Sequence, residues 1–333
     1  MARPAPIFVV GVARSGTTLL QALLGAHPHI AAPPEMHWFL RIYHQRDYWG
    51  ELDSPAGIRR VVAATLDMPG GMLDDIRIDA DDVMEHLSGA DVTYPDVLAA
   101  VMTTYAERHG KKRWSEKTPH QSPDDIWHAF PHAQVLHIVR DPRDVVASVA
   151  RAPFTNAGNG PSATARAWRD WNAAAMTAGH NAGPQQYLRV RYEDLCNDPE
   201  SVMDRVFDFL GEPRVPGVAD DLAARRSAVA ASAWWTHSAL HFVRPAPEPG
   251  RALGWGRRAL VTRMTRAVLE ELGYRTGTPT ETAVGTTAYA FVKARDRLRR
   301  SPPAVEMSAA ERHERVNALI DRMLSDAERS RPE

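Results

Sequence analysis

The residues best suited to chemistry near the amino terminus lie between two glycines, Gly11 and Gly16. Their four-residue gap resembles a phosphate-binding loop, G-x-x-x-x-G-K-[ST], in which backbone amides hold phosphate and a lysine reaches the terminal phosphates. Thr18 keeps the final hydroxyl of that pattern, but Thr17 stands at the lysine position and a cation, Arg14, comes three residues early. The sequence therefore predicts an anion-binding loop that differs from an ATP-binding one.

A second cation follows another apolar run of the chain. Residues 135–139, VLHIV, are typical of a buried strand and are followed directly by Arg140. The carboxyl end of a strand in a parallel sheet faces the ligand crevice, so a cation there suits a second phosphate. A magnesium-dependent phosphotransferase would instead favour an aspartate directly after such a strand. An ion pair of Arg140 with Asp141 or Asp144 at the surface is the alternative.

The elements that must position these residues alternate between strands and helices. Apolar runs and turn residues predict strands at 7–10, 135–139 and 187–190, and helices at 17–24, 94–109, 142–151, 163–179, 199–210 and 260–272. Residues 30–50 and 243–257 are expected to be irregular, and 192–194 to be an acidic turn. This order predicts an α/β fold in which a P-loop-type central parallel β-sheet is flanked by helices.

Composition narrows the class of protein. The 333 residues carry a formal net charge of −1, which argues against a dedicated nucleic-acid-binding protein. The single cysteine, Cys196, excludes an internal disulfide and a thiolate metal cluster. No segment reaches transmembrane length and no secretion signal stands at the amino terminus, so a cytoplasmic protein is expected. Five histidines lack metal-ligand spacing and are expected to be structural: His27, His29, His120, His128 and His132.

Four sequence blocks in a fixed order carry a resemblance to a known family. They are ARSGTTLL at 13–20, PPEMHWF at 33–39, SEKTP at 115–119 and IVRDPRDVVASVAR at 138–151. Two further blocks are weaker: RYEDL at 191–195 and GRALGWGRRAL at 250–260. With this set the chain resembles the sulfotransferases that use 3′-phosphoadenosine 5′-phosphosulfate (PAPS), in particular the carbohydrate and tyrosylprotein branch and its bacterial relatives. The RKG-type signature of the cytosolic branch is absent.

The resemblance implies how the phosphosulfate end of the donor is bound. Arg14 would contact the 5′-phosphate. The loop residues that follow would supply amides and hydroxyls: Ser15, Gly16, Thr17 and Thr18. The donor carries fewer charges than a nucleoside triphosphate, so no metal ion is expected.

The resemblance also implies a 3′-phosphate site. Arg140 and Ser148, eight residues apart, match the family's pair of an arginine at a strand end and a serine on the next helix. A small residue at a helix packing face is the other interpretation of Ser148. Arg251 or Arg257 would reach the 3′-phosphate from a late basic loop, and Tyr192 is either a nucleotide contact or a packed tyrosine.

For the transfer step, the resemblance points to Glu35 as the general base that takes the acceptor proton. Its aromatic neighbours are expected to desolvate it and raise its pKa. His37 is the rival base, or a hydrogen-bond partner of the acceptor. Lys117 would meet the bridging oxygen between sulfate and phosphate and stabilise the charge on the leaving group. The alternatives are a solvated carboxylate for Glu35 and, for Lys117, an ordinary surface lysine such as Lys111.

These assignments predict a PAPS-dependent sulfotransferase that forms a sulfate ester and 3′,5′-adenosine bisphosphate (PAP). The acceptor hydroxyl stays open among small molecules, sugars and lipid-linked glycans. Aromatic residues of 38–49, with Trp234 and Trp235, are expected to form its pocket or to pack a helical lid. Two other classes remain as alternatives: a magnesium-dependent, kinase-like phosphotransferase, and a non-catalytic nucleotide-binding protein.

The chain is expected to consist of a sulfotransferase domain at 1–275 and a helical extension at 276–333. Within the domain, a mainly helical insertion at 54–110 is expected to lie over the acceptor site. Trp168 and Trp171, at helical spacing, are expected to be core residues. The basic run Arg295–Arg300 is interpreted as a solvated helix face, with a membrane-surface or homo-oligomer contact as the alternative.

Overall fold

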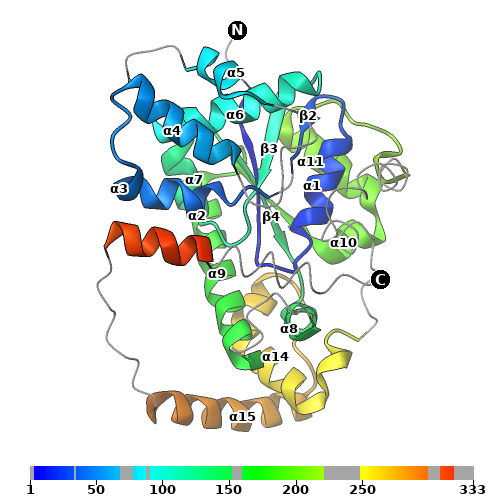
Figure 1. Cartoon of the computed structure of the whole chain (residues 1–333). Helices are drawn as coiled ribbons and strands as arrows, with labels where there is room; N and C mark the ends of the chain where they lie inside the picture. The colour runs from blue at the N-terminus through cyan, green and yellow to red at the C-terminus, as the bar shows by residue number, and fades with distance from the viewer. Residues whose placement is uncertain are drawn as a thin grey trace, which may run out of the picture.

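A parallel β-sheet forms the centre of the fold (Figure 1). The computed structural model describes residues 4–33, 35–67, 78–87, 91–151, 160–220, 248–298 and 308–318. Its five strands are β1 (Ile7–Val10), β2 (Ile30–Ala31), β3 (Arg113–Lys117), β4 (Gln134–Val139) and β5 (Tyr187–Arg191). Their order in the sheet is β2-β3-β1-β4-β5, and every neighbouring pair is parallel. The expected α/β fold is confirmed.

β1 lies in the middle of the sheet, between β3 and β4. Val9 of β1 is in register with Lys117 of β3, and Val10 with His137 of β4. All four residues of β1 are buried, as expected of a continuous apolar run with helices on both faces of the sheet. Because the strands are parallel, the segments that follow β1, β3, β4 and β5 all emerge at the same edge of the sheet.

The sequence pattern does not predict β2 and β3. β2 is only two residues long, and β3 reads RWSEK, which lacks the apolar run of a buried strand. All five residues of β3 are nevertheless buried. Arg113 donates hydrogen bonds to the carbonyl oxygens of Ala5 and Leu210, and the Ser115 hydroxyl donates to the side chain of Gln21. Distant residues therefore satisfy the buried polar groups of a strand that local sequence propensity does not predict.

Helices cover both faces of the sheet (Figure 1). The longer ones are α1 (Thr17–Ala26), α4 (Pro55–Leu66), α5 (Ala80–Glu85), α6 (Tyr94–Arg108), α7 (Pro123–Ala129), α8 (Pro142–Arg151), α9 (Gly160–Ala182), α11 (Pro199–Leu210), α14 (Trp255–Glu271) and α15 (Pro279–Leu298). The predicted helices are confirmed to within a few residues at their ends, which is where such predictions are least certain.

Three segments differ from the sequence-based expectation. The stretch 30–50 is not a loop, because it contains β2, α2 (Trp38–Arg41), a 3₁₀ turn (Tyr43–Gln45) and α3 (Arg46–Trp49). The acidic turn at 192–194 is the first half of α10 (Tyr192–Asn197). The irregular stretch 243–257 ends earlier than expected, because a 3₁₀ turn (Arg251–Leu253) leads directly into α14. Residues 243–247 lie outside the described part of the chain.

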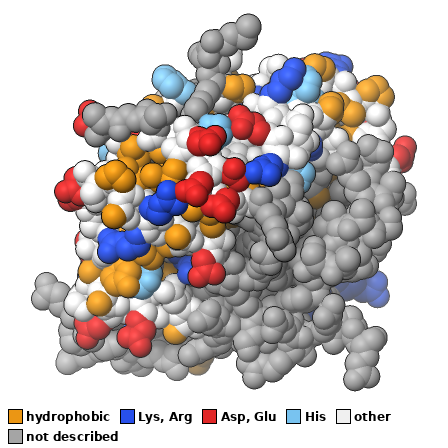
Figure 2. All heavy atoms as spheres, turned by 45° about the horizontal axis from the view of Figure 1, so that its top comes forward, with side chains coloured by type: hydrophobic (Ala, Val, Ile, Leu, Met, Phe, Trp, Pro, Cys, Tyr) orange, Lys and Arg blue, Asp and Glu red, His pale blue; other side chains and the backbone are white. Residues whose placement is uncertain are grey.

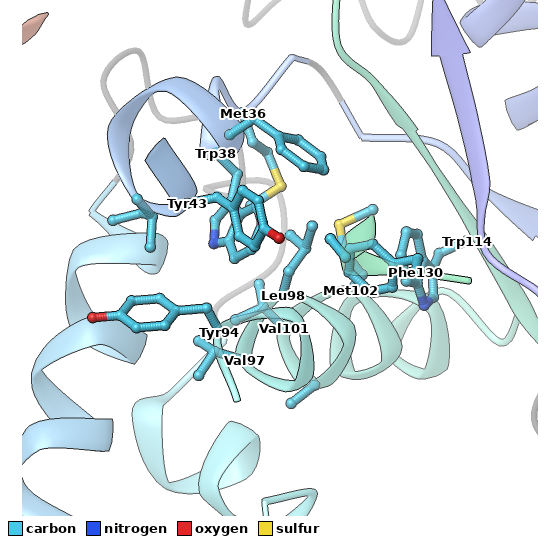
Figure 3. Packing of buried hydrophobic residues seen from close by; sticks show 14 of the residues in the cluster. Met36, Trp38, Tyr43, Tyr94, Val97, Leu98, Val101, Met102, Trp114 and Phe130 are labelled. Carbon is cyan, nitrogen blue, oxygen red and sulfur yellow. The ribbon is translucent and has the colours of Figure 1, made fainter. Parts of the chain in front are cut away.

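The core is divided between the two faces of the sheet. On one face α1, α10 and α11 bury apolar side chains such as Leu20, Leu23 and Phe207. On the other face an aromatic cluster joins the α2 region to α6; Figure 3 shows Met36, Trp38 and Tyr43 on one side and Leu98, Val101 and Met102 on the other. Trp168 is fully buried among Val12, Val139 and Val145, so its assignment to the core is confirmed.

The carboxy-terminal part of the described chain packs in two places. α15 lies along α14, far from the aromatic cluster (Figure 1). The helix at 309–318 instead lies beside α2 and α3. The ring of His313 stacks on Tyr48 with 3.8 Å between centroids, and its Nδ1 lies 2.7 Å from Oε1 of Gln45. Residues 276–333 therefore contain helices, as predicted, and one of them reaches the segment that follows Glu35.

The surface over α4, α5 and α6 carries charges of both signs. Arg59 pairs with Asp81, and Arg108 with Asp82, so that ion pairs link these three helices. Figure 2, with the top of Figure 1 turned forward, shows acidic, basic and hydrophobic side chains interspersed on the described part of this face. No basic stripe of the kind that binds a nucleic-acid backbone is present on this part of the surface.

Candidate active site

The predicted phosphate loop connects β1 to α1. Gly16 has φ +100°, and a Cβ there would overlap the ring of Tyr192, so both the backbone and the space require glycine. A Cβ at Gly11 would lie 2.6 Å from the carbonyl oxygen of Ile138. Among the residues that the structure describes, no side chain caps the amino terminus of α1. Its first amides are thus left for an anion, and the helix dipole favours negative charge there.

Two cations and a serine meet beside this loop. Nε of Arg14 donates a 3.2 Å hydrogen bond to Oγ of Ser148 on α8. Nη1 of Arg140 donates to the carbonyl oxygen of Arg14 at 3.1 Å, and its guanidinium lies 4.3 Å above the ring of Tyr192. Burial and the neighbouring Arg140 lower the pKa of Arg14. Two guanidinium groups this close repel each other, so an anion bound beside them would stabilise the site.

The start of α8 is fixed by partners other than Arg140. The carboxylate of Asp141 accepts two hydrogen bonds from the guanidinium of Arg143, at 2.8 and 2.6 Å. Asp144 accepts from the amide of Gly250 at 2.8 Å. In the described part of the chain no ion pair joins Arg140 to either aspartate, so the surface-pairing alternative is wrong. Arg140 is left facing the phosphate loop.

A carboxylate, an ammonium and an imidazole form a second group. Oε2 of Glu35 lies 2.9 Å from Nζ of Lys117, and Oε1 lies 3.0 Å from Nδ1 of His37. Nζ of Lys117 also donates a 3.1 Å hydrogen bond to Oγ1 of Thr18. Lys117 is the last residue of β3 and its side chain is only 7% exposed, so it is no surface lysine. This group is therefore in direct contact with the phosphate loop.

The aromatic neighbours of Glu35 predict a raised pKa, but in the structure its pKa is lowered. Burial does oppose ionisation, but the charges of Lys117 and His37 and their hydrogen bonds outweigh it and hold the pKa well below its usual range. Glu116, the residue before Lys117, behaves in the opposite way. Its carboxyl oxygens have no hydrogen-bond partner in the described residues, and burial, with the nearby Glu35 charge, raises its pKa to about 8. The surroundings of the two carboxyl groups thus shift their pKa values in opposite directions.

Three residues that sequence reasoning did not assign to the site contribute to it. His120, expected to be structural, accepts a hydrogen bond from the amide of Ala13 in the phosphate loop. The carboxylate of Glu193 accepts hydrogen bonds from the amide of Asp141 at 2.9 Å and from the hydroxyl of Tyr274 at 2.7 Å. It thereby anchors the start of α8. Glu116 is the third. The RYEDL and SEKTP blocks contain two of them, but nothing in the sequence indicates their partners.

The late basic loop is only partly placed. Arg251 and Arg257 are exposed, and neither side chain has a hydrogen-bond or ion-pair partner among the described residues. Arg258, in the first turn of α14, instead pairs with Glu248 and with Glu281 of α15. The contact between Gly250 and Asp144 does bring this loop against α8, which carries Ser148. Trp234 and Trp235 lie outside the described residues.

One further sequence-based expectation is wrong. Lys111, taken as typical of surface lysines, donates from Nζ to the carbonyl oxygens of Gly25, His27 and Ile30 and so caps the end of α1.

Two of the histidines lie close to a carboxylate, in a group of side chains of the types that bind metal ions. Side-chain atoms of His27, His29 and Glu212 lie within 4.8 Å of one another. Both ring nitrogens of His27 are engaged, since Nε2 donates to the carbonyl oxygen of Pro213 and Nδ1 accepts from the amide of His29. Glu212 pairs with His29 and Arg113. These contacts tie the end of α11 to the turn after α1, at the amino ends of β2 and β3 and away from the phosphate loop.

Comparison with known proteins identifies the family. The profile of the Sulfotransferase family matches residues 6–216, and the chain belongs to this family. Protein-tyrosine sulfotransferase A of Caenorhabditis elegans is 27% identical over 214 residues, which cover 62% of this chain and 50% of that protein. Nodulation protein NoeE of Sinorhizobium fredii is 30% identical over 232 residues, covering 62% and 51%. The chain thus spans about half the length of these relatives.

Solved structures support the fold. The sulfotransferase domain from the curacin biosynthetic pathway superimposes with a TM-score of 0.53 at 18% identity, over 82% of this chain and 99% of that domain. The match to the family profile and to these relatives confirms the family resemblance inferred from the motifs. No helix in the described ranges is both long and apolar enough to cross a membrane.

Proposed function

We propose that this protein transfers the sulfuryl group of PAPS to an acceptor hydroxyl. The observation that carries the proposal is the meeting of two groups at one edge of the sheet: an anion-binding loop flanked by Arg14 and Arg140, and the buried Glu35–Lys117 pair. The hydrogen bond between Lys117 and Thr18 connects the two. Family membership supports the same reaction.

The donor end is assigned to the loop and α8. Arg14 would hold the 5′-phosphate together with the hydroxyls of residues 15–18 and the amides of the loop, of which that of Ser15 already donates to the carbonyl oxygen of Val12. Arg140 and Ser148 would hold the 3′-phosphate, with Tyr192 packed under Arg140. Arg251 or Arg257 would complete this site from the late loop. These donors are amides, hydroxyls and guanidinium groups, which suit phosphate without a metal ion.

The transfer step is assigned to Glu35 and Lys117. Glu35 takes the proton of the acceptor hydroxyl as the new O–S bond forms. The S–O bond to the 5′-phosphate breaks, and Lys117 and Arg14 stabilise the negative charge that collects on departing PAP. His37, bonded to Glu35, would orient that carboxylate or the acceptor.

The ion pair suggests how donor binding prepares the base. In this structure the ammonium of Lys117 stabilises ionised Glu35 and makes it a weak base. If that ammonium turns toward the bridging oxygen of the donor, Glu35 loses its partner while it stays buried. Its pKa then rises, because only His37 is left to offset desolvation. Glu35 would thus become a competent base only when the donor is bound.

The acceptor side is assigned to the α2–α3 segment. Its apolar side chains pack against α6, in the described part of the predicted helical insertion (Figure 3). A hydroxyl on a small molecule, a sugar or a lipid-linked glycan would approach here. The boundary between a main domain at 1–275 and an extension at 276–333 is part of the same proposal.

Calorimetric titration tests the donor assignment. Purified protein is titrated with PAP, 5′-AMP and ATP, each with magnesium and with EDTA. Tight binding of PAP alone, unchanged by EDTA, is the expected result, and release of PAP from PAPS then demonstrates turnover. Preference for ATP with magnesium would overturn the proposal in favour of a kinase-like phosphotransferase. Tight PAP binding without any turnover would indicate a non-catalytic nucleotide-binding protein.

A further inference from the structure

His120 lies where the segment after β3 meets the phosphate loop. The amide of Thr118 donates to the carbonyl oxygen of Val9 at 2.9 Å, and the amide of His120 donates to that of Gly11 at 3.0 Å. The chain after Lys117 therefore continues to run along β1 and into the first limb of the loop. Trp171 of α9 holds the same segment from its other side, since Nε1 donates to the carbonyl oxygen of His120 at 2.9 Å.

The imidazole of His120 reaches the loop itself. The amide of Ala13 donates a 3.0 Å hydrogen bond to Nε2 of His120. A backbone amide can only donate, so Nε2 must be unprotonated and the ring proton of the neutral form must sit on Nδ1. Ala13 directly precedes Arg14, so this bond fixes the loop next to the residue assigned to the 5′-phosphate.

Backbone conformation gives an independent indication. Among the described residues, the non-glycine residues with positive φ are Arg14, His37 and His120, at +71°, +53° and +63°. Two of them belong to the site by the contacts already described. Such conformations cost free energy and persist where surrounding contacts enforce them, and they cluster at functional sites.

The surroundings of the ring favour its neutral form. Burial lowers the pKa of His120, and the Glu35 carboxylate, the charged group that acts on this ring, raises it by less. The other elements against the ring present the Ala13 amide and the uncharged indole of Trp171. The ring is still exposed to solvent in part, so a proton can reach it from the bulk.

We propose that His120 is a positioning residue of the donor site: its neutral imidazole accepts the Ala13 amide and holds the phosphate loop in the form that binds the donor. This inference rests on the proposed function. Protonation of Nε2 removes the acceptor, so the loop is released and donor affinity falls at acid pH. His120 thereby couples the position of the loop to Lys117, three residues earlier on the same segment.

Two substitutions separate the hydrogen bond from the ring. His120→Gln offers an amide oxygen near the position of Nε2 and does not titrate, whereas His120→Phe keeps a planar ring without an acceptor. His128→Phe, at an exposed position on α7, is the matched control. The dissociation constant for PAP is measured by calorimetry between pH 5.5 and 8, together with KM for PAPS and kcat for PAP release. PAP itself titrates in this range, so each value is compared with that of His120→Gln at the same pH.

The expected result has three parts. His120→Phe weakens PAP binding about three- to tenfold at pH 7.5, the value of one ordinary hydrogen bond, while His120→Gln and His128→Phe stay close to wild type. KM for PAPS rises in proportion and kcat changes less. As the pH falls through the lowered pKa of His120, wild type loses PAP affinity relative to His120→Gln.

Other results would overturn the inference. Equal PAP affinity of wild type and His120→Phe at every pH would show that the bond does not position the loop. A gain of affinity by wild type relative to His120→Gln at acid pH would show that His120 acts as a cation toward the anion. A fall in kcat with unchanged donor affinity would place His120 in acceptor chemistry. Absence of PAP binding by wild type would instead defeat the proposed function, before any variant is compared.

Discussion

Replacing Lys117 by methionine tests the centre of the proposed mechanism. Methionine keeps most of the length of the buried side chain and removes only the ammonium, which lies 2.9 Å from Glu35 and 3.1 Å from Thr18. Loss of one preorganised group that stabilises developing charge costs about 2.7–4 kcal/mol in the transition state, so turnover should fall by about 10²–10³.

The same substitution should change the pH dependence. Glu35 has a depressed pKa in the wild type, so it remains ionised down to acid pH. Without an opposite charge at this distance, the pKa should rise by about 1–3 units. The acid limb of kcat/KM should therefore move to higher pH by a similar amount. Lys112→Met, at the exposed position just before β3, is the matched control and should show neither effect.

The assay follows PAP release from PAPS by anion-exchange chromatography, with 4-nitrophenol as a probe acceptor and acceptor-free hydrolysis as the baseline. Calorimetry with PAP on the same preparations separates binding from turnover. If Lys117→Met retains turnover within about threefold of wild type, the leaving-group assignment fails. If turnover collapses but the acid limb stays in place, Glu35 is not the titrating base.

Three further predictions concern neighbouring residues. Glu35→Gln should lose turnover by about 10²-fold or more while PAP binding persists in calorimetry, and near-normal turnover would contradict its role as base. Arg140→Met should weaken PAP binding by at least about tenfold but leave 5′-AMP binding nearly unchanged; equal loss for both ligands would contradict the 3′-phosphate assignment. Glu116 has a raised pKa, so it keeps a proton in the folded state that the unfolded state releases above about pH 4.5. The destabilisation of the folded state by Glu116 therefore grows as the pH rises toward 8. Glu116→Gln should therefore unfold in urea with a free energy about 3 kcal/mol above wild type at pH 7 and with little difference at pH 4. A difference that did not change with pH would refute this explanation.

The local sequence was sufficient to predict the phosphate loop. An apolar run before Gly11 and a helix-forming run after Gly16 define a strand, a tight turn and a helix, all within contacts of a few residues. β4 and β5 follow from the same kind of local pattern. Once three strands are parallel, the residues at their carboxyl ends must share one edge of the sheet, which is why Arg14, Arg140 and Tyr192 meet as expected.

Local pattern could not predict β3, because its polar residues are satisfied only by distant partners. Arg113 needs the chain around Leu210, and Ser115 needs Gln21 of α1. Short elements such as α2 and α3 were missed for a related reason, since four residues carry too little periodicity to distinguish a helix from a loop.

The sequence by itself determined the residue types of the site and the family to which the chain belongs. Only the tertiary structure decided their electrostatic state. Aromatic neighbours predict a raised pKa for Glu35, yet an ion pair with Lys117, 82 positions away in the chain, lowers it. The same holds for His120, whose role depends on one amide of a loop more than 100 residues earlier. A pKa and a tautomer are set by charges and hydrogen bonds a few ångströms away, and those distances exist only after the sheet has brought its strands together.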